Sequence, residues 1–145
     1  MASKRISDIT RGIALLAESE GQGAPAAKGD RVVYNTKIWL HRGDEVPLNA
    51  MQSEHLPERM IRIVGQEKLI DHTVVLGRRE VIAGVEHSLL GMKAGGYRKV
   101  KVSPHLAYRE KGLPGLIPER ALLVIEIWLR EIVPAAVTGV VSVRK

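Results

Sequence analysis

Apolar and polar residues alternate along several stretches of the chain, as they do in β-strands that have one buried face. The alternation is clearest at residues 31–40 and 97–102 and in the apolar run 122–129, and residues 13–20 also predict a strand. A turn at residues 41–44 sends the second strand back toward Val46 as a hairpin. These elements predict a sheet that is mainly antiparallel and packs one face against the core.

Helical spacing interrupts the strands at one place. Ile82, Val85 and Leu89 recur at the period of an amphipathic helix, which predicts one short helix at about residues 83–90. A strand ends at Gly77 before this helix. After the helix comes the strand at residues 97–102, and a loop rich in Pro and Gly follows that strand at residues 103–118. The order strand, helix, strand, loop, strand predicts an α+β fold, a twisted antiparallel sheet wrapped around one short helix.

Three segments lie outside this pattern. Residues 1–12 are polar and mixed, and we interpret them as an N-terminal extension that is either a frayed end or an extra edge strand. Residues 47–71 form an insertion with enough apolar side chains to pack as a helix or a strand. Residues 133–145 form a C-terminal tail that is either an edge strand or disordered. The 145 residues therefore predict one domain, at residues 13–132, with two short ends.

Composition excludes several chemistries. The chain has no cysteine, so it has no disulfide, no thiolate metal site and no cysteine nucleophile. The 5 histidines include no pair at a tight ligand spacing, so we expect no metal and no other cofactor. No apolar stretch is long enough to cross a bilayer, and the first residues do not read as a secretory signal. We expect a soluble, cytoplasmic protein that does not bind membranes.

The net charge of +6 raises the question of nucleic-acid binding. Lys and Arg are scattered along the chain, and the local cluster at Arg98, Lys99 and Lys101 is typical of a solvated strand face. No base-stacking aromatic residues accompany this charge in the sequence, so nucleic acid is an unlikely partner.

A series of short motifs occurs in a fixed order in the second half of the chain. They are Leu76-Gly77, Val81-Ile82-Ala83-Gly84-Val85-Glu86, Gly91-Met92 with Gly95, Pro104-His105-Leu106-Ala107-Tyr108, Gly112-Leu113-Pro114-Gly115-Leu116-Ile117-Pro118, and the apolar strand that ends at Leu129. In this order they resemble the motifs of the FKBP-type peptidyl-prolyl cis–trans isomerases, the immunophilins that bind macrolides. The resemblance covers roughly residues 13–132 and implies the fold of that family.

The resemblance also implies a reaction, the rotation of X-Pro peptide bonds in peptides or unfolded proteins. This reaction breaks no covalent bond, because the obstacle is amide resonance with a barrier of about 18–20 kcal/mol. A catalyst has to hold the proline ring in an apolar cup, exclude water and anchor the neighbouring carbonyl groups. The absence of a catalytic triad from the sequence is compatible with such an enzyme.

The family motifs, carried over position by position, assign site residues. The resemblance implies that the Ile82 backbone N–H donates to a substrate carbonyl and that the Tyr108 hydroxyl lies on the rim of the cup. The substrate-binding residues that it implies are Val81, Val85, Leu113, Leu116, Ile117, Ile125, Asn35 and Val46.

The chain departs from the family at the aromatic positions of the cup. Val85 stands in place of the tryptophan of the cup floor, and the other aromatic positions fall on Asn35, Val46, His72 and Ile125. Because aromatic rings provide large, rigid contact area, we expect a weakened site and a slower isomerase. A different class of function stays open, a non-catalytic module that keeps the fold for protein binding or chaperone-like holding.

Overall fold

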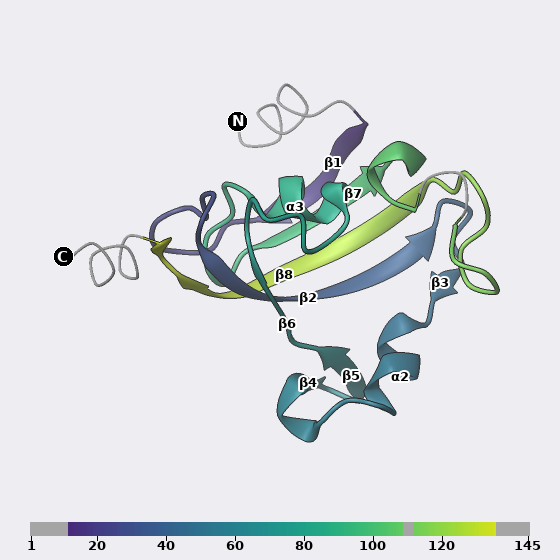
Figure 1. Ribbon diagram of the computed structural model, residues 1–145, viewed down its shortest axis with the longest axis horizontal. Coiled ribbons are helices and arrows are strands. Elements are labelled where there is room, and N and C mark those ends of the chain that lie inside the picture. The colour runs from purple at the N-terminus through teal and green to yellow at the C-terminus, as the bar shows by residue number, and fades with distance from the viewer. Residues whose placement is uncertain (1–11, 109–111, 136–145) are drawn as a thin grey trace.

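The computed structural model of the chain describes residues 12–108 and 112–135. Its main sheet is antiparallel and curled, with strand order β1-β7-β8-β2-β3, and β6 also pairs with β2 (Figure 1). The strands of this sheet are β1 (Ile13–Ser19), β2 (Arg31–Leu40), β3 (Glu45–Val46), β6 (His72–Val75), β7 (Tyr97–Val102) and β8 (Leu123–Val133). The predictions for residues 1–11 and 136–145 lie outside the described residues.

The predicted strands are confirmed, and the reason is visible in their burial. On β8 the inward row Leu123, Ile125, Ile127 and Leu129 is 0% exposed, and the residues between them are partly exposed. Alternating side chains of a strand point to opposite faces of the sheet, so this row forms the core face. The strand also continues to Val133, past its predicted end, because β2 supplies hydrogen-bonding partners up to that residue.

The predicted helix is confirmed as α3 (Ala83–Leu89), which lies on the concave face of the sheet (Figure 1). Val85 and Leu89 face the sheet and are buried. A Cβ atom at Gly84 would lie 2.4 Å from Val102 Cγ1 on β7, so only glycine allows this close approach of helix and strand. The α+β fold class is therefore confirmed.

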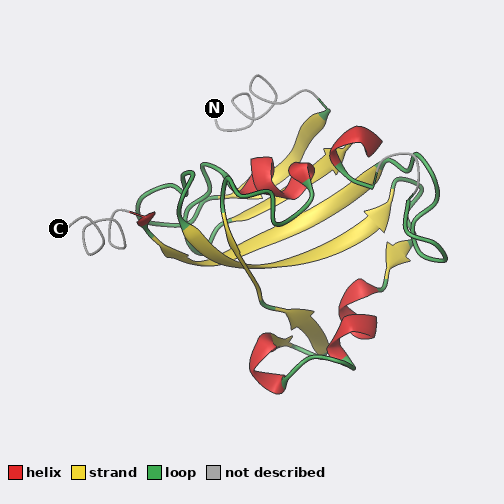
Figure 2. Cartoon of the chain, viewed as in Figure 1, coloured by secondary structure: helices red, strands yellow, loops and turns green. Residues whose placement is uncertain are grey.

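The insertion forms a small unit of its own on the opposite side of the sheet from α3 (Figure 2). It contains α2 (Leu48–Ser53), the 3-10 helix η1 (Glu58–Met60), and a two-stranded sheet of β4 (Ile61–Val64) and β5 (Glu67–Ile70). Asn49 attaches it to the main sheet, because its side-chain amide donates to Thr36 O on β2 at 2.7 Å. Within the insertion, the Asn49 Oδ1 accepts from Ile70 N on β5 at 3.2 Å.

Of the helices in the described part of the chain, none has the length and the apolar run that a membrane span needs.

Candidate functional site

The candidate site begins at the turn between β6 and α3. The Glu80 carboxylate closes this turn by accepting a hydrogen bond from Val75 N at 2.9 Å. Val81 and Ile82 follow, partly buried, and pack against the hydrophobic core. The Ile82 carbonyl accepts the first helical bonds, from Val85 N at 3.0 Å and from Glu86 N at 3.1 Å.

The Ile82 N–H remains available as a donor. Within residues 12–108 and 112–135, no backbone or side-chain group accepts a hydrogen bond from it. A buried or half-buried N–H without a partner is rare, because an unmade hydrogen bond costs about 1–3 kcal/mol. The backbone therefore offers one donor next to apolar side chains, which is the arrangement that an amide ligand requires.

Tyr108 brings a hydroxyl group to the same core. It follows η2 (Pro104–Leu106) and is partly buried. Burial raises the pKa of the Tyr108 hydroxyl above its ordinary value, so the group stays protonated and can donate a hydrogen bond.

Tyr34 is a member of this group that sequence reasoning missed. Its side chain is 2% exposed, and its ring is stacked on His72 with 5.2 Å between the ring centroids. Burial and, to a lesser extent, the nearby Tyr108 raise the pKa of Tyr34. The phase of β2 could have revealed it, because Tyr34 alternates in step with the buried residues Val32 and Ile38.

The loop that begins at residue 112 supplies three more of the predicted residues. Leu113 and Ile117 form an isolated bridge, with Leu113 N donating to Ile117 O and Ile117 N to Leu113 O, both at 2.8 Å. Ile117 is 3% exposed, and Leu113 and Leu116 pack against the core from the surface. Gly112 allows the tight return, since a Cβ atom there would lie 2.2 Å from Ile117 O.

Three predicted residues that stand where the family has aromatic side chains are part of the hydrophobic core. Val46 is 4% exposed, Val85 is 3% exposed and Ile125 is 0% exposed, and all three belong to one continuous hydrophobic cluster. The structure therefore brings them together with Val81, Ile82 and Tyr108.

The structure does not bring Asn35 into this group. Asn35 pairs with Trp128 across the sheet and lies on the outer face, under the insertion. Its amide donates to Ile70 O at 2.6 Å and to Asp71 Oδ1 at 2.8 Å, and its Oδ1 accepts from Arg130 Nε at 2.6 Å. Asn35 thus attaches the insertion to the sheet, on the opposite side from Tyr108.

Asp71 and His72 are neighbours in sequence but have different surroundings. Burial alone would raise the pKa of the Asp71 carboxyl, but hydrogen bonds from Arg62 and Asn35 and the charges of Arg62 and Arg130 lower it overall. Burial lowers the pKa of His72, and the charge of Asp71 offsets this only in part. His72 therefore contributes an uncharged ring to the candidate site at neutral pH.

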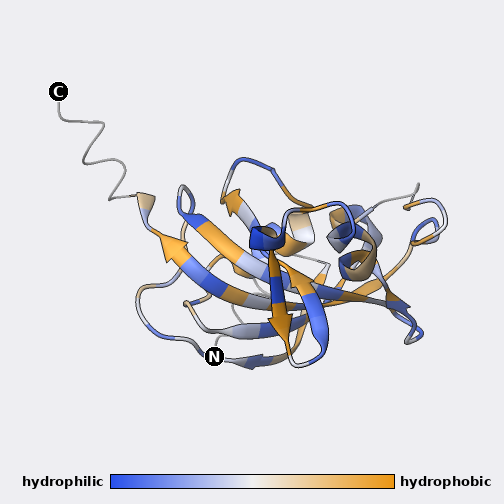
Figure 3. Cartoon of the chain, turned by 90° about the horizontal axis from the view of Figure 1, so that it is seen from below, coloured by the Kyte–Doolittle hydropathy of each residue, from blue (hydrophilic) through white to orange (hydrophobic). Residues whose placement is uncertain are grey.

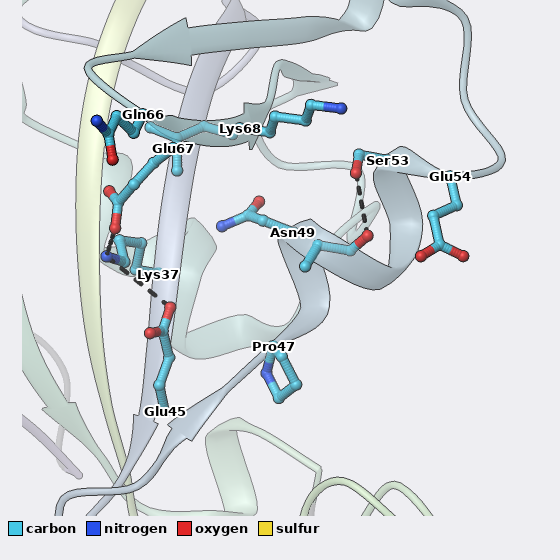
Figure 4. Close-up of a pocket in the computed structure, with 11 residues that line it drawn as sticks. Lys37, Glu45, Pro47, Asn49, Ser53, Glu54, Gln66, Glu67 and Lys68 are labelled. Atoms are coloured by element: carbon cyan, nitrogen blue, oxygen red, sulfur yellow. Dashed lines mark hydrogen bonds and ion pairs between the residues drawn. The ribbon is translucent and has the colours of Figure 1, made fainter.

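A polar hollow of about 470 Å³ lies elsewhere, on the insertion side between α2 and β5 (Figure 4). Lys37 lies at its base, with its ammonium group 2.6 Å from Glu67 Oε2 and 3.9 Å from Glu45 Oε2. Its charged groups are largely paired with one another, and they include no cluster that could hold a metal ion among the described residues.

Comparisons with known proteins agree with this fold. Residues 23–130 match the family model of the FKBP-type peptidyl-prolyl cis-trans isomerase. FK506-binding protein 4 of Chaetomium thermophilum is 48% identical over 124 residues, which are 86% of this chain but 22% of the fungal protein. FK506-binding protein 1A of Neurospora crassa is 30% identical over 79% of this chain and 83% of its own length. An FK506-binding protein of Neisseria meningitidis serogroup A is 28% identical over 78% of this chain and 89% of its own length.

Proposed function

The chain belongs to the FKBP-type peptidyl-prolyl cis–trans isomerase family, and from this premise we propose that it catalyses rotation about X-Pro bonds in peptides or unfolded protein chains. The observation that carries the proposal is the Ile82 N–H, which has no acceptor within the described residues and lies beside the apolar group of Val81, Val85 and Ile117. A proline-containing segment can use both features, because its carbonyl oxygen can accept from the Ile82 N–H and its apolar ring can pack against the apolar side chains.

The mechanism follows from the nature of the barrier. Rotation about the amide bond breaks its resonance, and the twisted amide is less polar than the planar one. A surface that excludes water therefore favours the twisted form over the planar form, which is the differential binding that catalysis requires. The partly exposed Val81 supplies this surface, and the buried Val85 and Ile117 of the same cluster support it from within the core. No proton has to be transferred.

The donors hold the substrate in place during rotation. The Ile82 N–H donates to a carbonyl oxygen that flanks the rotating bond and so fixes one end of the segment. The Tyr108 hydroxyl, kept protonated by burial, is a second donor for the substrate. The Tyr34 ring, stacked on His72, provides aromatic contact area that Val85 does not.

We propose that catalysis is slower than in members that retain an aromatic cup. Val85 and Ile125 present less rigid surface than the aromatic rings at those positions, so they hold a proline ring less firmly. The Tyr34 and His72 pair offsets part of this loss.

The experiment is a protease-coupled assay on a chromogenic peptide with one X-Pro bond, using the full chain. Ile82→Pro removes the N–H at a residue whose φ of −56° a proline can adopt. We expect it to lower the catalysed rate about tenfold, the equivalent of about one hydrogen bond. The control Ile82→Val keeps the N–H, and its rate should stay within about threefold of the wild type. Equal rates for the two variants, with equal melting temperatures, would contradict the assigned role of the N–H.

A second candidate, a non-catalytic protein-binding module with chaperone-like holding, has one observation in its favour. Val85 at 3% and Ile125 at 0% exposure are packed as core residues. A catalysed rate no higher than the spontaneous one, from protein that circular dichroism shows to be folded, would favour this module over the isomerase.

A further inference from the structure

The outer face of the main sheet carries a surface that the isomerase does not use. On β7 the residues Arg98, Val100 and Val102 are buried, so Tyr97, Lys99 and Lys101 point to the outer face. Tyr97 lies opposite Trp128 on β8, and Lys101 lies opposite Val124. Tyr97, Lys99, Lys101 and Trp128 together are called the basic–aromatic face below.

The two lysines of this face have no ion-pair partner among the described residues. Lys37, Lys93 and Arg98 form ion pairs with glutamates, whereas in the described part of the chain no carboxylate lies within ion-pair distance of Lys99 or Lys101. Residues i and i+2 of a strand are about 6.6 Å apart on the same face, so the two ammonium groups form one local positive site.

One carboxylate is present within the face. Glu126 lies opposite Lys99, and its Oε2 accepts a hydrogen bond from the Tyr97 hydroxyl at 2.5 Å. This bond orients the Tyr97 ring and commits the carboxylate to it. The positive charge of the two lysines therefore remains in excess.

The aromatic part of the face is an adjacent pair of rings. The rings of Tyr97 and Trp128 have centroids 5.4 Å apart and are tilted by 42°, and both side chains are partly exposed. Trp39, on the same outer side, is already in contact with a cation, because Lys37 Nζ lies 5.3 Å from its ring. Trp128 and Tyr97 are thus the rings that remain open to a ligand.

We propose that the basic–aromatic face binds single-stranded nucleic acid. The sequence alone makes nucleic acid an unlikely partner, because it shows no base-stacking aromatic residues beside the charge, but the pairing of β7 with β8 corrects this by placing Trp128 beside Tyr97. Lysines beside partly exposed aromatic rings on a sheet face match the two parts of such a ligand, because phosphates pair with the ammonium groups and unstacked bases stack on the rings. A duplex keeps its bases stacked and would use the lysines alone. An acidic polypeptide would also use the lysines but has no flat base to place on Trp128.

The face is separate from the isomerase site, so the two functions do not compete for space. Figure 3 looks at the molecule from the side of the insertion, where the strands carry alternating hydrophilic and hydrophobic bands. The Ile82 N–H and Tyr108 belong to the opposite side of the sheet, with α3.

The test is fluorescence anisotropy of the full chain with a labelled 12-nucleotide oligothymidine at 50 and 200 mM salt. The variant Lys99→Gln/Lys101→Gln should weaken binding at least tenfold at 50 mM salt and reduce the salt slope by about 1.4, from two lost phosphate contacts on a single strand. The control Lys28→Gln/Lys68→Gln removes the same charge elsewhere and should change affinity less than twofold. The lysine variant should keep the prolyl isomerase rate of the wild type.

The aromatic contribution has its own matched pair. Trp128→Leu should weaken oligothymidine binding about tenfold, and Trp39→Leu less than twofold, because the Trp39 ring is already covered by Lys37. An equal loss of oligothymidine affinity in Lys99→Gln/Lys101→Gln and in Lys28→Gln/Lys68→Gln would overturn the proposal. So would a duplex that binds as tightly as oligothymidine, or a poly-glutamate peptide that binds more tightly. No binding at 50 mM salt would overturn it as well, whatever the isomerase assay shows.

Discussion

Restoring the missing aromatic floor by Val85→Trp would distinguish a weakened site from one that has been repacked as core. Val85 is 3% exposed, and Ile125 and Leu89, in the same hydrophobic cluster, are both 0% exposed. An indole ring cannot enter such a cluster without moving its neighbours, because protein interiors are close-packed. We therefore expect the variant to be destabilised and its catalysed rate not to rise.

The size of the effect follows from overpacking. Extra buried atoms in a filled core cost about 1–3 kcal/mol or more. For a domain of this size a change of 1 kcal/mol shifts the melting temperature by roughly 3–5 °C, so we expect a drop of about 3–15 °C. The matched control is Val124→Trp, which places the same ring on the partly exposed outer face of β8 and should leave the melting temperature within about 2 °C.

Melting curves and the protease-coupled rate have to be measured on the same preparations. A Val85→Trp protein that is faster than the wild type and equally stable would refute the reasoning, because it would show an open floor at Val85. A loss of stability of the same size in Val124→Trp would show that the ring itself, and not the core, is the cause.

Three further changes test the interior of the structure. Asn35→Leu removes the acceptor of Arg130 Nε and the donor to Ile70 O and Asp71 Oδ1, so we expect urea unfolding to show a loss of about 1–3 kcal/mol, and an unchanged midpoint would contradict the role of these bonds. Gly84→Ala places a Cβ 2.4 Å from Val102 Cγ1 and should cost about 1–3 kcal/mol by the same measurement. Because burial lowers the pKa of His72, the unfolded chain binds this proton more readily, so wild-type stability should fall as the pH drops below about 6.5. His72→Phe should remove that part of the pH dependence, and identical melting temperature profiles between pH 8 and 5 would disprove it.

The sequence by itself determined the main strands, the helix that packs on them and their order, but not the elements of the insertion. Strand phase on β7 and β8 and the helical spacing of Ile82, Val85 and Leu89 depend only on neighbours along the chain, so they could be predicted without the fold. The order of the motifs then indicated the fold class, through the family that they resemble.

Only some of the residues of the candidate site could be predicted from the sequence. Val46, Val85, Ile117 and Ile125 converge as the family motifs imply, and their roles in binding stay predictions. Asn35 lies on the outer face, since successive residues of a strand point to opposite sides, and its neighbour Tyr34 faces the candidate site instead.

The tertiary structure alone decided which residues meet across the sheet. Lys99 and Trp128 are far apart along the chain, and the pairing of β7 with β8 places them on one face. The same holds for the insertion, which is attached to β2 where the Asn35 amide donates to Ile70 O and Asp71 Oδ1. Local periodicity fixes the side of a strand on which a residue lies, but its neighbours across the sheet are set by strand order and register, which depend on contacts between distant segments.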